Sequence, residues 1–81
     1  MSEDLIRGYI LREFLNGERP EALGADLPLI SSGVIDSVGT LRLVLFLEET
    51  FTIRIDPEDI SSGRLDTIGR MLALVDDKRP R

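Results

Sequence analysis

Apolar side chains recur at helical spacing in three separate parts of the chain, and this repeat restricts the chain to a helical fold. Only the segment 52–55 alternates as a strand does, and these four residues have no second strand with which to pair. We therefore predict an all-α fold. The helical patterns are Ile6, Tyr9, Ile10 and Phe14, then residues 37–50, then Ile68, Met71, Leu72 and Val75.

A short polar residue stands where each predicted helix would begin, and such side chains accept hydrogen bonds from the free N–H groups of a first helical turn. Pro57 supports a short third helix, because proline suits the first helical position. The predicted N-caps are Ser2, Asp36, Asp56 and Asp66.

Residues 17–35 are rich in Gly, Pro and Ser and predict a long loop, which follows a first helix that ends at Gly17. Four apolar side chains are expected to hold this loop against the helices: Leu23, Leu27, Leu29 and Ile30. The prediction is a four-helix bundle with three main helices, a short third helix, and a long loop between the first and second.

Length and composition exclude several classes of function. The 81 residues suffice for one domain, which we place at 1–77, with a basic, frayed tail at 78–81. A net charge of −5 argues against nucleic acid as a partner. Without Cys or His, the chain lacks a thiolate nucleophile, the usual general base and the commonest metal ligands. We therefore expect a protein that is not an enzyme and holds no metal.

The chain also lacks membrane and export signals. Its longest apolar runs are far shorter than a membrane span, and the acidic N-terminus differs from a signal peptide. We expect a cytoplasmic protein without membrane insertion.

The predicted second helix is apolar on two opposite faces. On one side lie Val38, Leu41 and Leu45, which we call the apolar stripe, flanked by Arg42, Glu48 and Glu49. This stripe is either covered by a bundle that surrounds the helix or serves as a docking surface with a charged rim. The other face, expected in the core, comprises Thr40, Leu43, Val44, Phe46, Leu47 and Phe51.

The start of this helix presents a serine. Asp36 can cap the helix, which leaves Ser37 at the first helical position with a free hydroxyl. A helix N-terminus favours an attached phosphate. Gly39 would keep the surface beside Ser37 low. These features predict a serine presented for modification.

The segment 33–38, Gly-Val-Ile-Asp-Ser-Val, resembles the attachment motif of acyl carrier proteins. The resemblance extends downstream through Leu43-Val44, Leu47-Glu48-Glu49, Phe51, Ile53, Ile55, Glu58-Asp59-Ile60, Leu65, Thr67 and Ile68. It implies that Ser37 carries 4′-phosphopantetheine, transferred from coenzyme A by a holo-carrier-protein synthase, and that the arm holds acyl groups as thioesters. The implied partners are this phosphopantetheinyl transferase and acyl ligase, acyltransferase or ketosynthase enzymes, which would meet a monomer.

The resemblance also implies which residues meet partners. Asp36, Val38, Leu41, Leu45, Glu48 and Glu49 align with the family's partner-contact positions. Arg42 stands where fatty-acid carriers usually have an acidic residue, and this departure favours a specialised lipid or secondary-metabolite pathway. The run Asp-Ser-x-Gly-Thr at 36–40 leaves an aminoacyl or D-alanyl carrier open, and an unmodified helical interaction module is the alternative from another class. The expected lining for a short acyl cargo is Leu43, Phe46, Leu47, Ile55 and Ile60.

Overall fold

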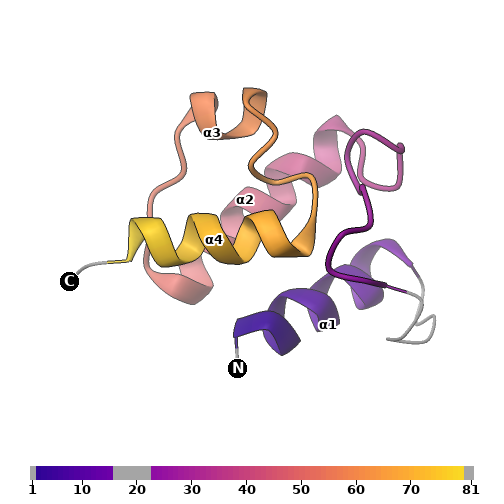
Figure 1. Ribbon diagram of the computed structural model, residues 1–81, viewed down its shortest axis with the longest axis horizontal. Coiled ribbons are helices and arrows are strands. Elements are labelled where there is room, and N and C mark those ends of the chain that lie inside the picture. Colours follow the sequence, from indigo (N-terminus) through magenta and orange to yellow (C-terminus); the bar gives the residue numbers. More distant parts are fainter. Residues whose placement is uncertain (1, 16–22, 80–81) are drawn as a thin grey trace.

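The computed structural model describes residues 2–15 and 23–79, and within them it contains four helices and no strand. The helices are α1 (Ser2–Phe14), α2 (Ser37–Phe51), α3 (Pro57–Ser61) and α4 (Ile68–Lys78). Helix α4 crosses in front of α2 in Figure 1, with α1 below and the short α3 above. The all-α prediction, with three main helices and a short third, is confirmed.

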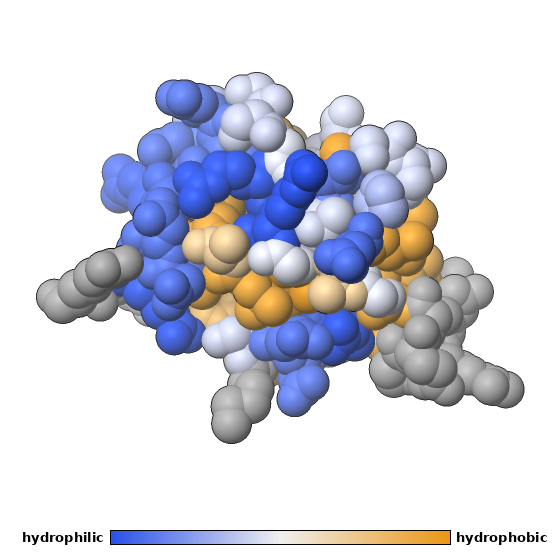
Figure 2. Space-filling view, viewed as in Figure 1, coloured by the Kyte–Doolittle hydropathy of each residue, from blue (hydrophilic) through white to orange (hydrophobic). Residues whose placement is uncertain are grey.

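The core forms where the three long helices meet. Helices α1 and α4 pack against each other. Apolar surface is visible across the middle of the face shown in Figure 2. The long loop adds Leu23, Leu29 and Ile35, each at most 1% exposed, whereas Leu27 is 40% exposed and does not pack the loop down as predicted. Other core side chains come from the helices: Ile6, Ile10, Leu43, Leu47, Ile68, Met71, Leu74 and Val75.

Two of the predicted helix starts are confirmed. Asp36 Oδ1 accepts a hydrogen bond of 2.7 Å from the Gly39 N–H and so caps α2. Helix α3 follows Asp56 and begins at Pro57, as expected. The backbone N–H of Asp56 donates to Asp59 Oδ2 at 2.9 Å, which closes the first turn from the other side.

The other two predicted caps are wrong. Thr67, not Asp66, caps α4, since Thr67 Oγ1 accepts from the Arg70 N–H at 3.0 Å. Asp66 binds a distant loop instead. Ser2 is the first residue inside α1 rather than the residue before it. Gly17, the expected end of the first helix, lies outside the described residues.

Residues 52–55 form no strand, although their alternation is real. Ile53 and Ile55 are buried whereas Thr52 and Arg54 are exposed, so an extended connector between α2 and α3 places every second side chain in the core.

The frayed tail predicted for 78–81 is wrong for its first two residues, Lys78 and Arg79. Lys78 lies in the last turn of α4, and its Nζ contacts Asp56 Oδ2 at 3.1 Å and Asp59 Oδ2 at 3.0 Å. Arg79 Nη2 donates to Ser2 Oγ at 3.2 Å, and its guanidinium lies 5.5 Å from the Phe51 ring centroid. These contacts with distant elements order the chain beyond residue 77. Residues 80–81 lie outside the described part.

Candidate modification and docking site

Ser37 is exposed at the first position of α2. The Asp36 carboxylate already accepts from the Gly39 N–H, and the Asp36 carbonyl accepts from Thr40 N at 2.8 Å and Thr40 Oγ1 at 2.9 Å. The helix is therefore capped without the Ser37 hydroxyl, which leaves that hydroxyl available for chemistry.

An open depression of about 540 Å³ adjoins this serine. It lies between the long loop, the first turns of α2, and α3. Its lining is mainly apolar and comprises Ile30, Gly33, Ile35, Asp36, Ser37, Thr40, Leu41 and Ile60. An apolar group carried on Ser37 would therefore find an apolar wall next to its attachment point.

Of the five residues expected to line a cargo site, only Ile60 lines this depression. Leu43, Leu47 and Ile55 are buried in the core. Phe46 packs against the core as expected but faces α1 rather than α3, since its ring stacks on Tyr9 with centroids 4.0 Å apart and planes at 11°. The bulk of Phe46 therefore does not limit the space between α2 and α3.

Asp66 holds the loop wall of the depression. Its Oδ1 accepts from the backbone N–H groups of Leu29 at 3.2 Å, Ile30 at 2.8 Å and Ser31 at 2.9 Å. Its Oδ2 accepts from Ser31 Oγ at 2.8 Å. These hydrogen bonds, led by those of Ser31, lower the pKa of the Asp66 carboxyl below its ordinary value. We call this set of contacts the Asp66 staple.

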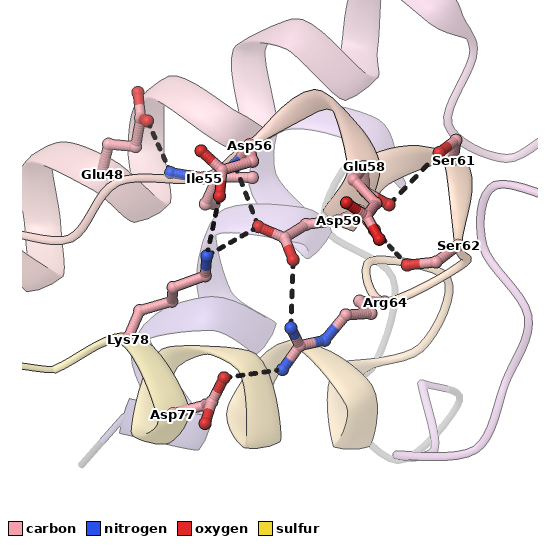
Figure 3. Close-up of polar contacts among 10 residues, drawn as sticks. All are labelled: Glu48, Ile55, Asp56, Glu58, Asp59, Ser61, Ser62, Arg64, Asp77 and Lys78. Carbon is pink, nitrogen blue, oxygen red and sulfur yellow. Dashed lines mark hydrogen bonds and ion pairs between the residues drawn. The ribbon is translucent and has the colours of Figure 1, made fainter.

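A second carboxylate fixes α3, which supplies Ile60 to the same depression. Figure 3 shows Asp59 between Lys78 and Arg64, whose Nη1 lies 3.0 Å from Asp59 Oδ1. Asp59 is 6% exposed, and its hydrogen bond from the Asp56 N–H, assisted by Lys78 and Arg64, lowers the pKa of its carboxyl. The hydrogen bonds of Lys78 to the Asp59 and Asp56 carboxylates raise the pKa of Lys78. Helix α3 is thus tied to the end of α4.

The apolar stripe on α2 is open to solvent. Val38, Leu41 and Leu45 are 67%, 61% and 57% exposed, so the bundle does not surround this helix. Arg42 and Glu49 are exposed beside the stripe. An exposed apolar row with charged borders is typical of a protein-docking surface.

Glu48 differs from the other predicted rim charges. It is half-buried, and its Oε2 accepts a hydrogen bond of 2.8 Å from the backbone N–H of Ile55. This contact ties the last turns of α2 to the connector before α3. Glu48 therefore has a role within the fold, which the sequence analysis missed.

Gly39 also has a structural role that differs from the expected one. It is buried, and a Cβ atom there would lie 2.6 Å from Phe14 Cε1 and 3.1 Å from Ile35 Cγ2. Glycine allows α1 to approach the start of α2. It does not serve to lower the surface beside Ser37.

Neither a membrane-spanning helix nor a metal site was expected from the sequence. Over residues 2–15 and 23–79, no helix has both the length and the apolar character needed to cross a bilayer. In the same residues, no three acidic side chains gather as they would around a metal ion.

A scan against models of protein families finds no match, and a search of curated proteins finds none either. A solved structure does match: the solution NMR structure of a holo acyl carrier protein from Nitrosomonas europaea is 32% identical in sequence. The match covers 95% of this chain and 93% of that one, with a TM-score of 0.68. The chain belongs to the acyl carrier protein family. The order of helices in this acyl carrier protein, including the short α3, agrees with that assignment.

Proposed function

We propose that this acyl carrier protein holds acyl groups as thioesters on a 4′-phosphopantetheine arm attached to Ser37 Oγ. On this proposal it delivers them to partner enzymes of a specialised lipid or secondary-metabolite pathway, and it has no catalytic activity of its own. The observation that carries the proposal is the exposed Ser37 at the start of α2, with its helix capped independently by Asp36.

The surroundings of Ser37 fit such an arm. A phosphodiester on Ser37 would stand at the N-terminus of a 15-residue helix, where free N–H groups and the helix dipole favour an anion. The apolar depression beside it offers partial shelter to a cargo. The arm would supply the thiol that the sequence lacks, and the residues of this chain would hold and present it.

The apolar stripe is the proposed contact surface for the synthase and for the acyl-handling enzymes. Six of the seven proposed contact residues are exposed and available for this role: Asp36, Val38, Leu41, Arg42, Leu45 and Glu49. Glu48 contributes less, because its carboxylate accepts a hydrogen bond from the Ile55 N–H. Packing against Phe14 accounts for Gly39, so the Asp-Ser-x-Gly-Thr run adds no support for a D-alanyl cargo.

Arm transfer tests the proposal directly. The wild-type protein and Ser37→Ala are incubated with coenzyme A and a broad-specificity phosphopantetheinyl transferase, and intact masses are measured. We expect one arm on the wild type and none on Ser37→Ala, with unchanged far-UV circular dichroism because the cap remains. Ser61→Ala, at another exposed serine, is the matched control and should accept the arm. An unmodified wild type, or an arm on Ser37→Ala, would contradict the proposal.

A further inference from the structure

The apolar stripe of α2 continues into a shallow hollow between α2 and α1. The hollow has a volume of about 390 Å³ and is lined by Tyr9, Arg42, Leu45, Phe46, Glu49 and Thr50. Leu45 belongs to both the stripe and the hollow, so the two form one continuous surface. None of the six residues that line the hollow also lines the depression beside Ser37, which the stripe borders through Leu41.

The hollow has an aromatic floor. Tyr9 stacks on Phe46 and meets the edge of Phe14 at a centroid distance of 5.9 Å, so the Tyr9 ring is held from two sides. Rigid aromatic side chains beside an exposed leucine are characteristic of the anchors in protein interfaces.

Opposite charges border this hollow in a fixed order. Arg42, Leu45 and Glu49 follow one another at i, i+3 and i+7, so a guanidinium, an apolar group and a carboxylate stand in one row along α2. Among the residues that the structure describes, neither Arg42 nor Glu49 takes part in an ion pair. By contrast, Arg12 of α1, whose guanidinium lies 5.8 Å from the Tyr9 ring centroid, is paired with Glu13 at 3.2 Å.

Arg42 is the only basic residue in α2. A wholly basic partner surface would be attracted by Asp36 and Glu49 but would meet a like charge between them. A surface with a carboxylate opposite Arg42 would instead gain a charge-assisted, bidentate hydrogen bond of the kind that guanidinium groups form with carboxylates.

We propose that Arg42 determines partner choice: it favours enzymes that place a carboxylate against it, with an apolar side chain over Leu45 and a basic one against Glu49, and it disfavours enzymes with a wholly basic docking face. The inference rests on the proposed carrier function. It assigns the selectivity to one side chain and to the hollow beside it.

The test measures kcat/KM for arm transfer by a phosphopantetheinyl transferase with a basic docking face, at low and high salt. We expect Arg42→Glu to raise kcat/KM about tenfold at low salt, Arg42→Gln to have a smaller effect, and high salt to reduce both gains. Arg54→Glu is the matched control, because it makes the same charge change on an exposed side chain away from the hollow, and should change kcat/KM less than twofold.

A charge swap on the transferase completes the test. Its basic docking residues are replaced by Glu one at a time, and at least one replacement should reverse the preference, so that the wild-type carrier is used better than Arg42→Glu. Leu45→Ala should slow transfer by every version of the enzyme. Equal kcat/KM for all Arg42 variants, or gains matched by Arg54→Glu, would overturn the proposal. If the wild-type carrier accepts no arm at all, the proposed function fails instead, and the two failures are thereby distinguished.

Discussion

Replacement of Asp66 by Ala should destabilise the protein, because the Asp66 staple joins two parts of the chain. Three of its hydrogen bonds are short: those from Ile30 N, Ser31 N and Ser31 Oγ, at 2.8 to 2.9 Å. The Leu29 N–H lies 3.2 Å from Asp66 Oδ1 but also donates to the Asp66 backbone carbonyl at 2.8 Å. Its bond to the side chain therefore adds little to the stabilisation by the carboxylate.

Hydrogen bonds to a charged group contribute about 1.5–3 kcal/mol each when buried. Asp66 is partly exposed, so water replaces some of what is lost, and about 1 kcal/mol for each short bond is the better figure. The expected loss for Asp66→Ala is about 3 kcal/mol, which for a domain of this size lowers Tm by about 15 °C. Asp66→Asn keeps a neutral acceptor and should lose about half as much.

Urea unfolding followed by circular dichroism measures these differences, with Asp76→Ala as the control for loss of an exposed carboxylate from α4. The pKa of Asp66 is lower in the folded protein than in the unfolded chain. The stabilisation is therefore fully present above the ordinary Asp pKa of about 4 and is lost as pH falls through the folded pKa. The difference in unfolding free energy between wild type and Asp66→Ala should therefore become smaller in acid. A gap below about 0.5 kcal/mol near pH 7, or one that does not change with pH, would refute this reasoning.

Two further predictions concern Gly39 and Glu48, whose structural roles the sequence analysis missed. Gly39→Ala gains about 1 kcal/mol of helix propensity, but its Cβ would displace the Phe14 ring, and overpacking costs about 1–3 kcal/mol. We expect the unfolding free energy, measured in urea, to fall by about 1 kcal/mol. A rise in the unfolding free energy would show that the Phe14 ring moves aside freely. Glu48→Ala should cost about 1–2 kcal/mol, because it leaves the Ile55 N–H without its acceptor, whereas Glu49→Ala should leave the unfolding free energy unchanged. Equal effects of the two changes would contradict the role assigned to Glu48.

Features that depend on near neighbours in the sequence were predictable. The Asp36 cap acts on a residue three positions away, and the Asp56-Pro57 start of α3 is equally local. Helical geometry placed the apolar stripe opposite the core face, but only the structure shows that the bundle leaves it exposed.

The errors concern side chains whose partners are far away along the chain. Asp66 binds residues 35 to 37 positions earlier, and Lys78 reaches Asp56 across 22 positions. Asp66 is a residue type expected at a helix cap and Lys78 one expected in a basic tail, and only the tertiary structure shows their long-range contacts. The role of Gly39 and the place of Phe46 in the cargo lining were misassigned for the same reason, since their neighbours Phe14 and Tyr9 lie on α1.

The Asp66 staple also has a consequence for the order in which the protein can be completed during synthesis. The loop that walls Ser37 is held by Asp66 and by a hydrogen bond of 2.9 Å from the Gly69 N–H to the Ala25 carbonyl, both supplied by residues translated about thirty positions after the serine. Such long-range contacts form later than the local contacts of a helix. Until Asp66 and Gly69 have joined the fold, the wall beside Ser37 is not held, although α2 can already be helical. A transferase that requires the finished surface can therefore act only after these later residues have folded against the loop.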